Sequence, residues 1–64
     1  MCESRVYLLE NGRRTRVMDE AILVREVEGK VVAVSVVGER RDFEGARIVE
    51  IDMDRHSITI ERGK

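Results

Sequence analysis

The residue with the clearest capacity for chemistry is Cys2, the only cysteine in this 64-residue chain. Removal of Met1 would free the Cys2 amine, and this amine and the thiolate could then chelate one metal ion. If Met1 is retained, its amine, the Cys2 amide nitrogen and the Cys2 thiolate can still bind together. Nitrogen plus thiolate suits Ni(II), Cu or Zn far better than Mg or Ca. The competing interpretation is a small apolar residue near a chain end.

The only histidine, His56, is the second candidate ligand. It shares strand parity with Ile58 and Ile60, which predicts a half-buried side chain on their face. His56 is then either a structural histidine with a local hydrogen bond, or a metal ligand or partner of the Cys2 thiolate. Because Cys2 begins the first predicted strand and His56 the last, the two meet only if these strands are neighbours.

The carboxylates match no catalytic pattern. Glu50, Asp52 and Asp54 alternate with apolar residues, which is typical of a solvated strand face. The sequence contains no phosphate-binding loop, nucleophile elbow or zinc-protease motif. One Cys and one His in so small a chain leave little room for a catalytic pocket. We therefore expect a protein that is not an enzyme.

Positive charge is concentrated in two short clusters, residues 13–16 and residues 40–41, which suit solubility and the protection of sheet edges. The net charge of −1 argues against nucleic acid as a partner, since nucleic-acid binders carry a basic excess. With 3% aromatic residues, the chain also offers few platforms for stacked bases. The alternative function is an RNA-binding or protein-interaction β-barrel whose cysteine is incidental.

Glycines divide the chain into short segments rich in Val and Ile, which predicts an all-β fold. Asn11-Gly12 is the strongest hairpin signal, because both residue types accept positive φ. The run from Val31 to Val37 is apolar on both faces, so we expect a central strand, or one whose second face is buried by a partner. A single helical turn over residues 18–21 is the one helical alternative. The predicted strands cover residues 3–9, 13–17, 21–27, 30–37, 40–43, 46–53 and 56–62.

About seven short strands predict one domain, residues 1–64, folded as a closed or half-closed small β-barrel of the Src-homology-3 type. So small a core is marginal. A lone cysteine forms no internal disulfide, so self-association is the expected source of extra stability. The sequence shows no signal peptide and no apolar run of membrane-spanning length. The free thiol fits a reducing compartment, which predicts a cytosolic protein without a membrane partner.

The segment from Met1 to Leu8, with Cys2 directly before a predicted strand, resembles the start of the CooT family of small nickel-binding proteins. The resemblance continues through the Asn11-Gly12 hairpin, the Val-rich middle, the turn at residues 44–45, and residues 48–52 followed by His56. It implies a small β-barrel, a homodimer, and Ni(II) bound through Cys2. It also implies nickel delivery to carbon monoxide dehydrogenase, while delivery to another nickel enzyme or nickel storage stays open. It assigns no role to His56.

A homodimer would complete the ligand set that one chain leaves unfinished. One N-terminus offers one amine and one thiolate, whereas two copies related by a twofold axis supply a square-planar set suited to Ni(II). The sequence therefore predicts a nickel-binding accessory protein with Cys2 at a homodimer axis and His56 as the second candidate ligand.

Overall fold

The computed structural model describes residues 3–63, and in that range it contains strands, turns and short loops but no helix. The predicted all-β fold is confirmed, but the strands number six rather than seven, and residues 18–21 form no helical turn. The strands are β1 (Ser4–Glu10), β2 (Arg13–Val27), β3 (Lys30–Ser35), β4 (Arg40–Glu44), β5 (Ala46–Asp52) and β6 (Ser57–Arg62).

Tight turns of two residues close the first two hairpins. Asn11 and Gly12 join β1 to β2 with φ of 54° and 76°, and Glu28 and Gly29 join β2 to β3 with φ of 44° and 83°. Positive φ at both central residues gives the chain the twist that neighbouring antiparallel strands need. The hairpin predicted at Asn11-Gly12 is therefore confirmed.

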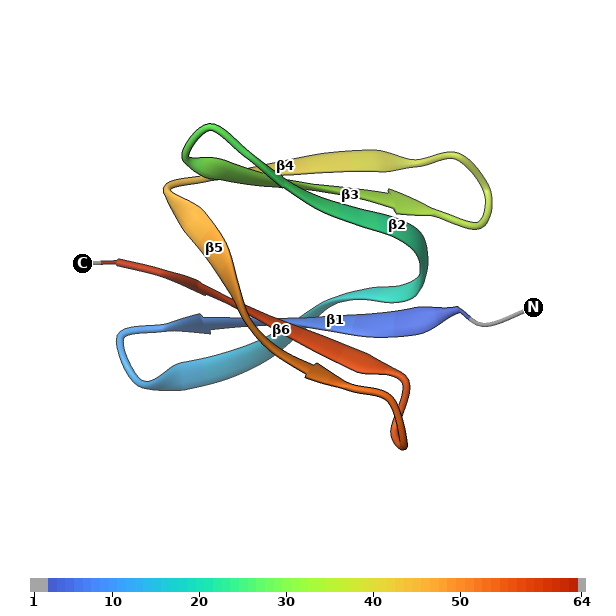
Figure 1. The fold of residues 1–64 in the computed structure, drawn as a ribbon, viewed down its shortest axis with the longest axis horizontal. Helices are drawn as coiled ribbons and strands as arrows, with labels where there is room; N and C mark the ends of the chain where they lie inside the picture. Colours follow the sequence, from blue (N-terminus) through green and yellow to red (C-terminus); the bar gives the residue numbers. More distant parts are fainter. Residues whose placement is uncertain (1–2, 64) are drawn as a thin grey trace.

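β2 is one long bent strand of 15 residues where two shorter strands were predicted. Its first half pairs with β1, and from Ala21 onward it pairs with β3. Between these halves the pairing with β1 shifts register, from Val6 opposite Met18 to Ser4 opposite Ala21. The extra residue bends the strand, so that Met18 and Ala21 are both buried in the core. Figure 1 shows this bend carrying the chain from one side of the molecule to the other.

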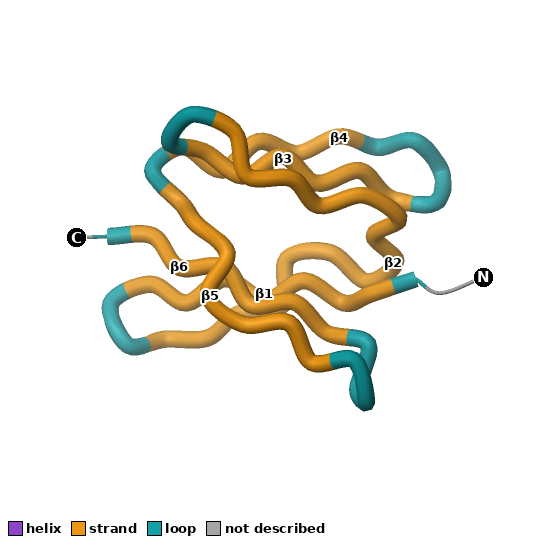
Figure 2. Tube along the Cα trace, viewed as in Figure 1, coloured by secondary structure: helices purple, strands orange, loops and turns teal. Residues whose placement is uncertain are grey.

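The strands form one mixed sheet in the order β4-β3-β2-β1-β6-β5. Neighbours are antiparallel except β1 and β6, which run parallel. The sheet curls into a half-barrel, with β3 and β4 facing β1, β6 and β5 across the core (Figure 2). It stays open because β5 crosses the β2–β3 hairpin instead of pairing with β4. There Gly45 N–H donates to the Gly29 carbonyl at 2.8 Å, and Ile48 N–H donates to Glu26 Oε1 at 3.0 Å.

The apolar core fills the inside of this curve. Every strand contributes to it, and the most completely buried large side chains are Val6, Val31 and Ile60. The other buried members of the cluster are Leu8, Met18, Ala21, Ala33, Phe43 and Ala46.

β3 is a central strand, as predicted, but it ends at Ser35 and needs no partner chain to cover it. Val31, Val32 and Ala33 are all buried within the single chain, so the alternative in which a partner buries the second face was wrong for these residues. The strand ends because Ser35 Oγ accepts hydrogen bonds from the N–H groups of Val37 and Glu39, at 3.3 and 3.1 Å. Val37 therefore lies in a turn and is 83% exposed.

Candidate metal site

Cys2 lies outside the described residues. The structure describes the strands that surround the start of β1, and we call these surroundings the frame. That frame begins at Ser4, which lies opposite Ala21 of β2, and at Arg5, which lies opposite Ser57 of β6. The first and last strands are therefore neighbours. The sequence analysis named this as the condition for Cys2 and His56 to lie close together, but could not predict it.

His56 lies in the turn before β6 and is exposed. Its φ of 51° reverses the local chain direction, so the alternation of β6 does not extend back to it. The expectation of a half-buried histidine sharing the face of Ile58 and Ile60 was therefore wrong. The turn is nonetheless fixed to β1, because Arg5 N–H donates to the His56 carbonyl at 2.9 Å.

A shallow depression joins His56 to the residue that follows Cys2. Three carboxylates border it, from Glu3 before β1 and from Asp19 and Glu20 at the bend of β2. Sequence reasoning did not single out these carboxylates, because only the register of β1 against β2 and β6 brings them together. The other lining residues are Arg5, Arg16 and Arg55.

Arginines moderate the negative charge of this depression. Arg16 Nε lies 3.2 Å from Asp19 Oδ1, and Arg5 Nη2 donates to the Arg55 carbonyl at 2.9 Å. Among residues 3–63, no three His, Cys, Asp or Glu side chains are grouped so that they could hold a metal ion. A metal bound at this end of the molecule would therefore need donors from the N-terminal residues, from a second chain, or from both.

Apolar side chains are exposed at the same end of the molecule. β1 and β6 begin there, and β3 and β5 end there, so that the β3–β4 and β5–β6 turns lie at the same end as the start of β1 (Figure 1). Val37 in the first turn is 83% exposed and Met53 in the second is 79% exposed, and Ile51 at the end of β5 is 59% exposed. We call Val37, Ile51 and Met53 the apolar end.

The family model for the carbon monoxide dehydrogenase accessory protein CooT matches residues 1–61 of this chain. The chain belongs to the CooT family. The CooT resemblance drawn from the opening segment, the hairpin and the Val-rich middle is therefore confirmed.

The fold is also that of a solved CooT structure. A crystal structure assigned to CooT from Carboxydothermus hydrogenoformans superposes with a TM-score of 0.81 and covers 98% of this chain and 100% of the other. The two sequences are 17% identical, so this likeness concerns the fold. A search of curated protein sequences found no match.

The other carboxylates considered in the sequence analysis of this CooT chain are exposed or take part in local contacts. Glu50 and Asp54 are exposed, and Asp52 Oδ1 accepts the Arg55 N–H at 3.1 Å, which caps the turn before β6. On the edge strand β4, Arg40 Nε lies 2.9 Å from Asp42 Oδ1. Within the described range, no helix has the length and apolar character to span a bilayer.

Proposed function

We propose that this protein binds Ni(II) through Cys2 as cargo and supplies it, in the cytosol, to carbon monoxide dehydrogenase. The observation that carries the proposal is the CooT family match, which includes Cys2 in its matched range and names carbon monoxide dehydrogenase as the enzyme served. Accessory work also agrees with the absence of catalytic motifs in the sequence.

The chemistry of Cys2 suits this cargo. A thiolate and an adjacent nitrogen form a soft, strongly donating pair that favours Ni(II) over Mg or Ca, and a bound metal would remove the thiol proton. One chain supplies only part of a four-coordinate set. A second copy would add an equal pair, so we propose one nickel ion for two chains at a homodimer axis.

The apolar end offers a surface on which such a dimer would form. Val37, Ile51 and Met53 are exposed around the end from which the N-terminal residues emerge. Burying these side chains against the same residues of a second copy would remove apolar surface from water. The same contact would bring the two Cys2 residues toward one another, and nickel would strengthen the dimer by mass action.

His56 has a secondary role in this proposal. It is exposed on the depression that also includes Glu3, so its imidazole lies on the side of the molecule where Cys2 is attached. A neutral imidazole is a good nickel ligand. We propose that His56 assists nickel entry or completes the coordination, with Cys2 as the indispensable ligand.

The test is a nickel titration of protein with a native N-terminus. Native mass spectrometry would report the stoichiometry, the oligomeric state and the fate of Met1, and absorption would report thiolate-to-nickel charge transfer. We expect one nickel for two chains, and loss of both binding and absorption in Cys2→Ser. A variant with added N-terminal residues controls for the amine. Nickel binding by Cys2→Ser as tight as that of the native protein would refute the proposal.

A further inference from the structure

The first half of β2 has a free backbone edge. β1 pairs with it on one side from Arg13 to Ala21, whereas β3 begins to pair on the other side only at Ala21. Within the described part of the chain, no strand lies against residues 13–20 on that second side. Unpaired strand edges are templates for pairing with another extended chain.

Two hydrogen bonds show which backbone groups face this side. Arg41 Nη1 donates to the Val17 carbonyl at 2.8 Å, and Val36 N–H donates to the Glu20 carbonyl at 2.8 Å. The two-residue turn pairs Glu10 with Arg13, so the N–H and C=O of Arg13 and Thr15 face β1 and those of Arg14 and Arg16 face the free side. The register shift makes Val17 an extra residue, and its carbonyl therefore lies on the same free side as those of Arg14 and Arg16. The edge therefore offers donors and acceptors in the spacing that an added strand requires.

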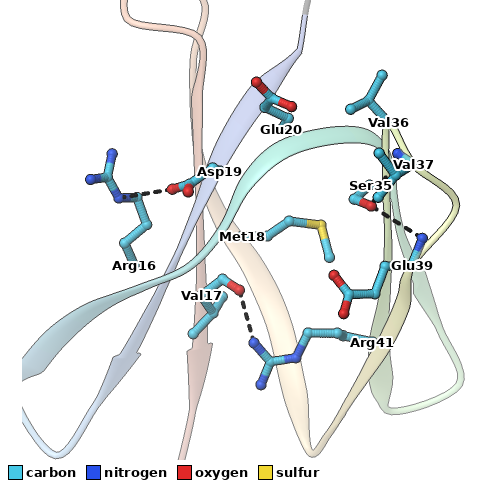
Figure 3. Close-up of a pocket in the computed structure, with 10 residues that line it drawn as sticks. All are labelled: Arg16, Val17, Met18, Asp19, Glu20, Ser35, Val36, Val37, Glu39 and Arg41. Atoms are coloured by element: carbon cyan, nitrogen blue, oxygen red, sulfur yellow. Dashed lines mark hydrogen bonds and ion pairs between the residues drawn. The ribbon is translucent and has the colours of Figure 1, made fainter.

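A hollow of about 790 Å³ lies beside this edge and gives an added strand room. One wall is the middle of β2, and the other is the β3–β4 turn with the start of β4. Figure 3 shows Met18 between these walls and Arg41 reaching across to Val17. Arg41 contacts the edge through one side-chain hydrogen bond, and an incoming backbone N–H could replace that bond.

The side chains along the edge are divided by charge. Arg13, Arg14 and Arg16 lie toward one end, and Asp19 and Glu20 lie toward the other, all of them exposed. Arg16 and Asp19 are paired with one another. Arg13 and Glu20 belong to none of the ion pairs formed within residues 3–63, so each end keeps a free charge.

We propose that the free edge of β2 binds an extended segment of a partner protein as an added antiparallel strand. Backbone hydrogen bonds to residues 13–19 supply the affinity, and the divided charges set the direction of the segment. Such a segment has basic residues at its start, opposite Asp19 and Glu20, and acidic residues at its end, opposite Arg13 and Arg14. Its middle is short and β-branched, to fit beside Met18.

The proposal is tested with a synthetic eight-residue peptide that has two lysines first, threonine and valine in the middle and two glutamates last. Binding to the untagged protein is measured by fluorescence anisotropy, and protection of the β2 amides by hydrogen exchange. Two versions of the peptide carry N-methyl groups on opposite sets of alternate amides. We expect one version to bind at least tenfold more weakly and the other to bind as the parent does, because only one set faces β2.

Arg14→Pro should block the site while leaving the sheet intact. Proline removes the outward N–H of Arg14 and is tolerated on the open side of an edge strand. We expect Arg14→Pro to bind the peptide at least tenfold more weakly than the control Arg14→Val, which loses the same charge but keeps the N–H. If Arg14→Pro does not fold, Arg13→Glu provides a second test, since its weakened binding should recover with a peptide whose final glutamates are replaced by lysines.

Three outcomes would overturn the proposal. They are equal binding of both N-methylated peptides, the absence of new amide protection in residues 13–19, and a peptide that competes only with self-association of the protein. The last would mean that the edge pairs with a second copy of this chain. Because the peptide contains no nickel ligand of the proposed type and the assay needs no metal, failure here would not bear on nickel binding through Cys2.

Discussion

The backbone N–H of Arg5 donates to the carbonyl of His56 at 2.9 Å, which fixes the start of β1 to the turn before β6. In a parallel pair a residue bonds to the neighbours of its partner, so this is the first hydrogen bond of the β1–β6 pairing, where Arg5 lies opposite Ser57. The segment that carries Cys2 therefore leaves a frame built from both ends of the chain, and His56 belongs to that frame whether or not its imidazole binds metal.

Replacing His56 separates its backbone role from any role in metal binding. At φ 51°, a left-handed conformation costs an L-residue about 1–2 kcal/mol, and glycine avoids this cost while losing more chain entropy on folding. We expect His56→Gly to match the native free energy of unfolding within about 1 kcal/mol, and His56→Val to be less stable than His56→Gly because a β-branched residue suits this region poorly. Chemical denaturation measures both.

Nickel titration of His56→Gly then addresses the ligand role. We expect a smaller loss of affinity than in Cys2→Ser, since the thiolate is the softer donor. A loss as complete as that in the cysteine variant would make His56 a direct ligand.

Charges placed on the apolar end should weaken the proposed dimer. Val37→Lys combined with Met53→Lys puts two cations where exposed apolar side chains would be buried, and burying unpaired charge is costly. Sedimentation velocity of the metal-free protein at micromolar concentration should show a dimer for the native chain and a monomer for the variant. Leu23→Lys, at a partly exposed position on β2, is the matched control. A double variant that stays dimeric would place the interface elsewhere.

Asp42 should make stability depend on acid pH. Hydrogen bonds from Arg40 and Lys30 lower the pKa of Asp42 to about 2, whereas an unfolded aspartate titrates near about 3.9. The stabilisation is therefore present above about pH 4 and is lost as pH falls through about 2. Denaturation from pH 5 to 2 should show a flatter pH dependence for Asp42→Asn than for the native chain. Asp54→Asn, at an exposed turn position outside the ion pairs formed within residues 3–63, is the matched control.

Ile60 tests the core of the half-barrel. Its side chain is fully buried, and removing such a side chain to alanine costs about 2–5 kcal/mol. Because a chain of this size has a marginal core, Ile60→Ala should be largely unfolded at 37 °C, whereas Ile58→Ala, at a half-buried position, should stay folded. Circular dichroism at matched concentration measures both. Equal melting temperatures would contradict the burial of Ile60.

Local chemistry accounts for the parts of the fold that the sequence predicts well. Asn and Gly accept positive φ readily, so the Asn11-Gly12 pair alone predicts the first hairpin. The β-branched residues of β3 exclude a helix. Cys2 stands out as a candidate metal ligand by its element and its position alone, and its role stays a prediction.

Relationships between distant segments account for what the sequence could not predict. The register shift beside Met18 interrupts the alternation of buried and exposed side chains along β2. The sequence pattern therefore predicted two short strands in place of one long strand. The left-handed turn at His56 shifts the apparent parity of its side chain. Nothing local records that β6 pairs in parallel with β1, and this pairing is what brings Glu3, Asp19 and His56 to one depression.

The position of β6 in the sheet also orders events during synthesis. It is the last of the six strands along the chain, yet it lies between β1 and β5. A polypeptide emerges from the ribosome with its N-terminal end first, so β1 waits for its second neighbour, and β5 for its only one, until residues 57–62 are free. The frame beside Cys2 is thus complete only after β6 has been made, so the residue is synthesised well before the frame next to it exists.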